Sequence, residues 1–313
     1  MLALARYALK GPYQAATIVG LLAIVAVVLP LMGGSPLATM IITGALTLFS
    51  GALVGLVILT HGSRSGLKAV VVSIIGITVV ATIALEAPMI GISIGLAQWL
   101  PIVILAQILR STNSLVLMML TGLALALLAI VLQLLIWPDL EADWLFMIEQ
   151  SILQLKAYPE YQDVDITSNA RLLVHFMVIM LGAALYSLFI GILLMARSMQ
   201  SKLSDSADKF SAEFRAISFG KRVGLVAVFL LSLSFWLNQA WISSIALLLM
   251  TAFLFQGIAV VHTKVSRSKR PRLLKTLFYL LLLIFPQAAV ITALVGLLDN
   301  WLILRKPANI KST

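Results

Sequence analysis

The chain has 313 residues, of which 61% are hydrophobic and only 11% are charged, and its formal net charge is +10. Soluble domains carry about 25% charged residues, so this composition excludes a water-exposed surface over most of the chain and makes lipid its main solvent. The positive charge does not indicate nucleic-acid binding, because the Lys and Arg residues cluster at the ends of apolar runs.

Nine apolar runs are long enough to cross a bilayer as helices of ~20 residues. Hydrocarbon leaves no water to satisfy an open strand edge, so each run should be a helix. We therefore expect an all-α fold, a polytopic transmembrane helical bundle. The predicted spans are residues 15–32, 36–60, 67–86, 89–109, 114–137, 172–196, 221–238, 240–262 and 276–300.

The first and last runs need separate comment. The first follows Arg6 and Lys10 and ends without a small-residue cleavage site, which predicts an uncleaved span rather than a removed signal peptide. The last contains Pro286, which removes a helix hydrogen bond. Nine spans are the main prediction, and eight spans plus a re-entrant element are the alternative.

One polar stretch divides the chain into three regions. Residues 1–137 form a five-span block, 138–171 a connecting segment, and 172–313 a second block with basic loops. The Lys and Arg residues concentrate in loops on one side, which predicts a cytoplasmic N-terminus and a 138–171 segment on the outer side of the membrane. Arg305, Lys306 and Lys311 obey this rule only if the last run returns to the cytoplasm.

Two segments outside the spans have amphipathic patterns. Residues 140–155 carry apolar side chains at helical spacing, which predicts a helix on the membrane surface or a lid over an outward cavity. On the inner side, Phe210 and Phe214 lie among basic residues. With the basic loop they predict one contact surface for anionic lipid or for a membrane or cytoplasmic protein partner; the loop residues are Arg267, Lys269 and Arg270.

Polar side chains inside spans are costly and indicate function. Glu86, Gln98 and Asp299 are predicted to line an outward pocket for a small polar or cationic solute, with Arg305 as a counter-charge for Asp299. The alternative is that Glu86 lies at the water interface and that Gln98 bonds a neighbouring helix. Small-residue pairs predict close helix contacts: Gly51 with Gly55, and Gly91 with Gly95.

No cofactor or metal site is expected, and the chain is not expected to be an enzyme. With no Cys, thiolate zinc sites, iron–sulfur clusters and cysteine catalysis are excluded. The three His residues fall on separate segments, and neither HExxH nor GxxxxGK[ST] occurs. One catalytic alternative is a rhomboid-like intramembrane serine protease, with Ser93 and His175 as the pair, although Ile94 follows Ser93 where that family has Gly.

Two short patterns near the end of the chain resemble a known family. Residues 255–262 read FQGIAVVH, and residues 296–301 read GLLDNW, followed by Arg305. Both resemble the YybS-like bacterial membrane proteins, and Gln256, Gly257, His262, Trp301 and Arg305 carry the pattern. That family is distantly similar to the S components of energy-coupling-factor transporters, which bind small molecules in an outward pocket and dock a transmembrane partner.

The resemblance implies a multi-pass protein of the bacterial inner membrane, with the 138–171 segment in the periplasm. The leading hypothesis is therefore a small-solute-binding or transport subunit that resembles an S component. The second is a membrane scaffold or assembly partner that does not transport, and the third is the protease.

Overall fold

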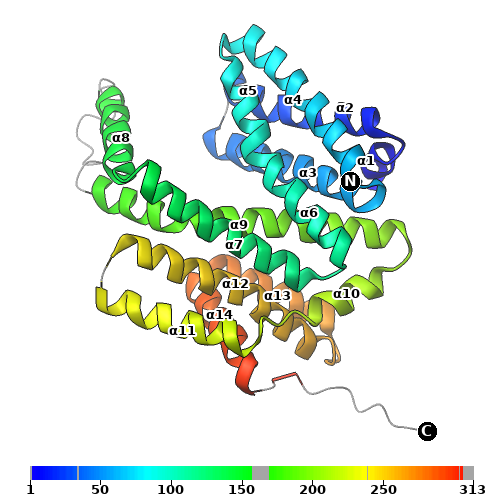
Figure 1. The fold of residues 1–313 in the computed structure, drawn as a ribbon, viewed down its shortest axis with the longest axis vertical. Coiled ribbons are helices and arrows are strands. Elements are labelled where there is room, and N and C mark those ends of the chain that lie inside the picture. Colours follow the sequence, from blue (N-terminus) through cyan, green and yellow to red (C-terminus); the bar gives the residue numbers. More distant parts are fainter. Residues whose placement is uncertain (1, 34, 157–168, 238, 303, 306–313) are drawn as a thin grey trace. The chain divides into compact units, whose positions relative to one another are not determined.

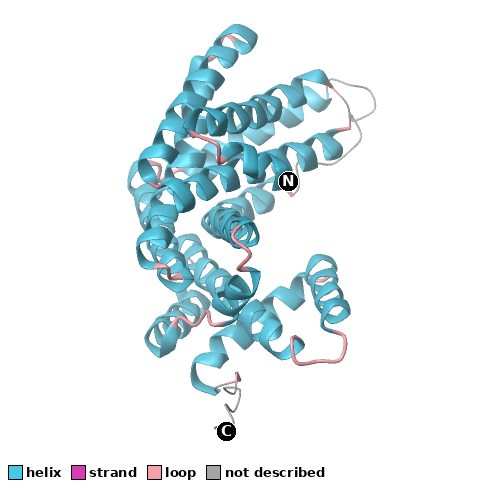
Figure 2. Ribbon diagram, turned by 90° about the vertical axis from the view of Figure 1, so that its right-hand side faces the viewer, coloured by secondary structure: helices cyan, strands magenta, loops and turns pink. Residues whose placement is uncertain are grey.

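The computed structural model describes residues 2–33, 35–156, 169–237, 239–302 and 304–305. Within these residues every regular element is a helix and there is no strand (Figure 2). The predicted all-α fold is therefore confirmed. Most of the loop expected at 158–169, and the tail residues Lys306 and Lys311, lie outside the described residues.

The first part of the chain forms seven α-helices, one 3₁₀ turn and one π-helical turn (Figure 1). In order they are α1 (Leu2–Ala8), α2 (Pro12–Val28), η1 (Leu29–Met32), α3 (Pro36–His61), α4 (Ser63–Leu85), α5 (Pro88–Ile94), η2 (Gly95–Trp99), α6 (Leu100–Thr112) and α7 (Leu115–Ile136). Pro at the first position of α2, α3 and α5 suits a helix start, because that N–H has no partner in the helix.

The second part forms seven more helices. They are α8 (Leu140–Lys156), α9 (Ala170–Leu203), α10 (Ala207–Arg215), α11 (Gly220–Leu237), α12 (Ala240–Val265), α13 (Pro271–Ile284) and α14 (Pro286–Leu302). The expected amphipathic helix at 140–155 corresponds to α8, and the helix that carries Phe210 and Phe214 is α10.

Eight helical segments of the described chain are long and apolar enough to cross a membrane. They agree with the first eight predicted spans to within a few residues, except that the helix of the sixth, α9, continues to Leu203. The chain is thus a multi-pass membrane protein. The ninth predicted span is not one helix: α13 and α14 meet at Phe285 and Pro286 with a bend of 117°. The break lies at the proline, where a helix hydrogen bond is lost.

By its internal contacts the chain divides into two compact units. Unit 1 comprises residues 1–122 and 188–216, and unit 2 comprises residues 123–187 and 217–313. Helices α7 and α9 each contribute residues to both units. In unit 2 these two helices lie side by side, where a Cβ on Gly182 would lie 3.0 Å from Cδ1 of Ile130 (Figure 1).

Unit 1 is built around α3, whose residues 49–59 are all buried. The predicted small-residue contacts are present here. A Cβ on Gly51 would lie 2.7 Å from Ile102, and one on Gly95 would lie 2.4 Å from Ile74. Two buried serines tie the helices together, because Ser50 donates to the carbonyl of Val19 and Ser73 to that of Ala16.

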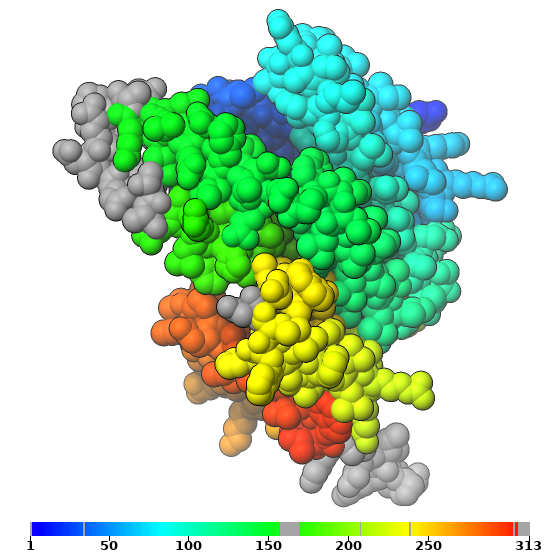
Figure 3. All heavy atoms as spheres, turned by 60° about the vertical axis from the view of Figure 1, so that its left-hand side comes forward, coloured from blue at the N-terminus to red at the C-terminus, as the bar shows by residue number. Residues whose placement is uncertain are grey.

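Unit 2 is built around α12, which packs against α11 and α14. In the space-filling view the end of α14, in red, lies against α11, in yellow (Figure 3). A Cβ on Gly224 of α11 would lie 2.7 Å from the indole of Trp301, so this glycine makes room for the Trp ring. Helix α13 contributes no buried residue.

Candidate functional site

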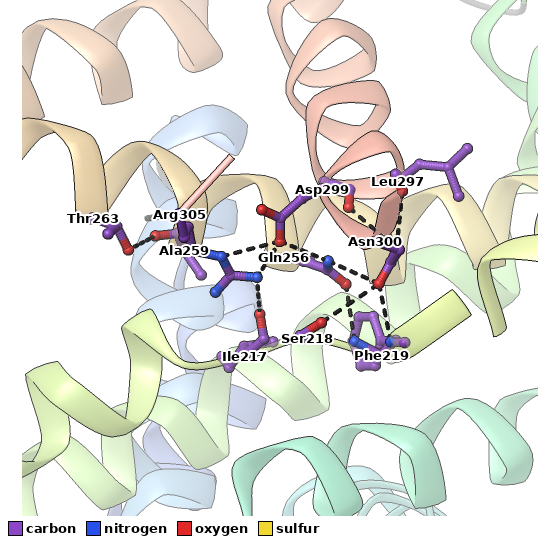
Figure 4. Close-up of polar contacts among 12 residues, drawn as sticks. Ile217, Ser218, Phe219, Gln256, Ala259, Thr263, Leu297, Asp299, Asn300 and Arg305 are labelled. Atoms are coloured by element: carbon purple, nitrogen blue, oxygen red, sulfur yellow. Dashed lines mark hydrogen bonds and ion pairs between the residues drawn. The ribbon is translucent and has the colours of Figure 1, made fainter. Parts of the chain in front are cut away.

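Two glycines bring α12 and α14 into backbone contact. A Cβ added to Gly257 would lie 1.9 Å from the carbonyl oxygen of Thr292, and one added to Gly296 would lie 2.1 Å from that of Phe253. Neither distance admits a side chain, so only glycine permits this approach. The approach brings Gln256 of α12 next to Asp299 and Asn300 of α14 (Figure 4).

Gln256 lies at the centre of a polar group that we call the Gln256 cluster: the side chains of Gln256, Asp299, Asn300 and Arg305. Gln256 is fully buried. Its Nε2 donates to Oδ2 of Asp299 at 3.1 Å and to Oδ1 of Asn300 at 3.2 Å. Its Oε1 accepts from the backbone N–H of Phe219 at 3.0 Å. All three bonds are made to other elements, so Gln256 joins α12 to α14 and to the segment that leads into α11.

Asn300 strengthens the same junction. Its side-chain oxygen accepts from the backbone N–H of Gly220 at 3.0 Å, and its Nδ2 donates to the carbonyl of Leu297 at 2.9 Å. Gly220 has a φ of +83°, a left-handed conformation that favours glycine. The start of α11 is thus held against the end of α14.

Asp299 and Arg305 form an ion pair, as the sequence suggested. The side chains are 4% and 15% exposed, respectively. Arg305 Nε donates to Asp299 Oδ2 at 3.0 Å, Nη2 contacts the same oxygen, and Nη2 also donates to the carbonyl of Ile217 at 2.7 Å (Figure 4). A carboxylate this deeply buried needs a compensating charge, and a residue just beyond α14 supplies it.

The other residues of the family-like pattern lie around this cluster. Gly257 makes the backbone contact described above, and Trp301 packs on Gly224. His262 lies further along α12, where its Nε2 is 2.9 Å from the hydroxyl of Tyr279 on α13. The pattern residues therefore serve the packing of α11, α12, α13 and α14 as well as the polar cluster.

Glu86 and Gln98, the other predicted solute ligands, belong to unit 1, whereas Asp299 belongs to unit 2. Glu86 is exposed and ends α4 in a left-handed conformation, with a φ of 52°. Gln98 lies in the π-helical turn η2, and its Nε2 donates to the carbonyl of Thr47 on α3 at 3.0 Å. The bond from Gln98 to a neighbouring helix is one of the two explanations that the sequence left open.

The predicted contact surface also draws on both units. Phe210 and Phe214 belong to α10 in unit 1, with ring centroids 6.3 Å apart. The basic residues Arg267, Lys269 and Arg270 are exposed in the loop between α12 and α13 of unit 2. Whether these two groups form one surface remains a prediction.

The two residues of the protease hypothesis each have another partner. The hydroxyl of Ser93 donates to the carbonyl of Met89, one turn earlier in the same helix. Nδ1 of His175 lies 3.2 Å from the carboxylate of Glu141, so the ion pair, when His175 is protonated, holds α8 to α9. Both polar groups therefore have a partner in the structure, and the protease hypothesis stays untested.

Sequence reasoning missed the amide partners of Asp299. The sequence shows the residues themselves, because Gln256 is an amide inside a span and Asn300 is adjacent to Asp299, but it does not show that they meet. Comparison of the chain with protein-family models, with curated proteins and with solved structures finds no match.

Proposed function

We propose that this chain binds a small polar or cationic solute within the membrane, as its resemblance to S components implies. The observation that carries the proposal is a buried carboxylate, Asp299, in the last turn of α14. Ionisable residues inside membrane helices are rare and mark solute or ion pathways.

Asp299 is the group of the site that would bind a solute cation, in exchange for Arg305. Asp299 is the acid of the Gln256 cluster, and Arg305 neutralises it. Arg305 follows the last residue of α14, Leu302, after a short link, so its guanidinium can leave without unfolding a helix. In this proposal Arg305 pairs with the carboxylate of Asp299 when no solute is bound. A solute cation then replaces Arg305 at this carboxylate and at the carbonyl of Ile217.

The location of the protein is part of the proposal. We place it in a bacterial inner membrane, as the resemblance implies. We place the basic loops on the cytoplasmic side, because these loops carry most of the 22 Lys and Arg residues. Unit 2 supports a re-entrant arrangement of α13 and α14. A bend above 90° turns α14 back, and Asn300 at its end bonds Gly220, next to the basic pair Lys221 and Arg222. In this arrangement Asp299, next to Asn300, lies near the cytoplasmic side, so the proposed site opens inward and not outward as in the sequence-based prediction.

Thermal stabilisation of the purified protein tests the proposal. A panel of methylguanidinium, primary and quaternary amines and neutral polyols would be screened in detergent. A solute that binds the folded state stabilises it by ~2.7 kcal/mol at a hundredfold excess over its Kd. At least one solute should raise the melting temperature of the wild type but not that of Asp299→Asn. Ser244→Ala is the control and should respond like the wild type, because the Ser244 side chain is buried on α12 and bonds only its own helix.

The scaffold hypothesis has one observation in its favour. The amide of Gln256 is bonded to Phe219, Asp299 and Asn300 at both its oxygen and its nitrogen, as a purely structural junction requires. A scaffold predicts that no solute in the panel stabilises the wild type, or that any stabilisation persists fully in a folded Asp299→Asn variant. Either result would replace solute binding by the scaffold function.

A further inference from the structure

A polar cavity of about 180 Å³ lies in unit 1, at the junction of α9 and α10. It is far larger than the ~10–15 Å³ that one water molecule needs. The lining is almost entirely polar, as are α10 and the end of α9 that form most of it. The lining residues are Asn113, Arg197, Gln200, Ser201, Ser204, Ser206, Lys209, Phe210 and Glu213.

Part of the cavity lining is a network of hydrogen bonds. Arg197 binds Glu213 of α10 through two bonds, Nε to Oε2 at 3.0 Å and Nη2 to Oε1 at 2.8 Å. Its Nη1 donates to Oε1 of Gln200 at 2.8 Å, and Gln200 Nε2 donates to the carbonyl of Leu59 at 3.1 Å. Bidentate pairs of Arg with a carboxylate are stronger than hydrogen bonds between neutral groups, so this pair holds α10 to the end of α9.

The net charge of the residues that line the cavity is positive. Arg197 and Lys209 are the lining bases and Glu213 is the lining acid, which leaves one net positive charge. Lys209 is exposed, and no carboxylate among the described residues lies within salt-bridge distance of it. Its ammonium lies at the cavity and can reach an anion there, whereas the hydroxyl of Ser204 already donates to the carbonyl of Gln200 at 2.9 Å.

The aromatic residues of α10 beside the cavity indicate a ligand from the membrane surface. Phe210 lines the cavity, and Phe214 lies one turn further along α10. An amphipathic helix with aromatic and basic residues is typical of the boundary between headgroups and acyl chains. A phosphate in the cavity would therefore place its attached chains beside the two Phe rings.

We propose that this cavity binds the phosphate of an anionic phospholipid headgroup, with Lys209 as the charged contact and Phe210 beside the acyl chains. This site is separate from the Gln256 cluster and does not depend on the proposed solute binding. A free phosphate ion offers the same chemistry without the chains, so the test must separate the two sources.

The test measures retention of phosphatidylglycerol by the purified protein, with native mass spectrometry as the readout. Lys209→Gln should lower the bound lipid about fivefold, the effect of one basic residue near an anionic surface. Lys202→Gln is the matched control, because Lys202 is exposed on the last turn of α9 and does not line the cavity. Ser204→Leu, which fills the cavity without changing charge, should lower retention as well.

The outcomes are distinct, provided that each variant keeps the wild-type melting temperature. Equal losses in Lys209→Gln and Lys202→Gln, or no loss in Ser204→Leu, would mean that surface charge alone attracts the lipid and would overturn the site. Stabilisation by inorganic phosphate that depends on Lys209, without specific lipid retention, would assign the cavity to a free anion instead. Phosphatidylcholine, whose headgroup is zwitterionic, should be retained less than phosphatidylglycerol.

Discussion

At the scale of single residues, Gln256 is the side chain on which the junction of unit 2 depends. It is fully buried and bonds to three other residues on two further segments. Leucine in its place would leave the Phe219 N–H without its acceptor and would remove a donor from the buried carboxylate of Asp299. An unsatisfied buried group costs about 1–3 kcal/mol, and more when it is charged.

We therefore expect Gln256→Leu to destabilise the protein by about 2–4 kcal/mol, measured by unfolding in detergent. Gln133→Leu is the matched control, because Gln133 bonds only the carbonyl of Trp137 in its own vicinity. That variant should change stability by no more than about 0.5 kcal/mol. Equal effects of the two substitutions would mean that the hydrogen bonds of Gln256 add nothing to stability.

Part of this junction could be predicted from the sequence. The pairing of Asp299 with Arg305 follows from charge and closeness along the chain. The partners of Gln256 could not be predicted, because Asp299 and Asn300 lie more than forty residues away. They meet only because Gly257 and Gly296 allow two backbones to touch, and a single sequence does not say which of its glycines face one another.

At the scale of elements, the break at Pro286 decides the path of the chain. The missing N–H of proline predicts an interruption, but not its angle. The bend of 117° is compatible with one broken span and with a re-entrant element, and we propose the re-entrant element. In this proposal the described chain crosses the membrane eight times, and the N-terminal and C-terminal segments face the same side.

Cysteine labelling tests this topology cleanly, because the chain has no native Cys. Single cysteines would be placed at Ser268, between α12 and α13, at Ser151 on α8, and after the C-terminal residue. A membrane-impermeant reagent should label the C-terminal cysteine from the same side as Ser268→Cys and from the side opposite to Ser151→Cys. Labelling of the C-terminal cysteine together with Ser151→Cys would restore the nine-span arrangement.

At the scale of the whole molecule, composition predicts the class and contacts define the units. A chain with 61% hydrophobic residues has to use lipid as solvent, and the lengths of its apolar runs predict its helices well. The two units are harder to predict from the sequence than the helices are. Each unit is discontinuous in sequence, because α7 and α9 contribute residues to both. The loops in the sequence show where helices end, but they do not show which helices pack together.

The central claim is that Asp299 anchors a solute and that Arg305 occupies this carboxylate in its absence. Equilibrium binding of the solute panel to purified protein in nanodiscs tests it most directly. We predict one saturable site per chain that is lost in Asp299→Asn. Its Kd should be about tenfold lower in Arg305→Gln, where no internal cation competes, and nearly unchanged in Arg305→Lys. The absence of saturable binding to the wild type, or equal binding to Asp299→Asn, would contradict the account.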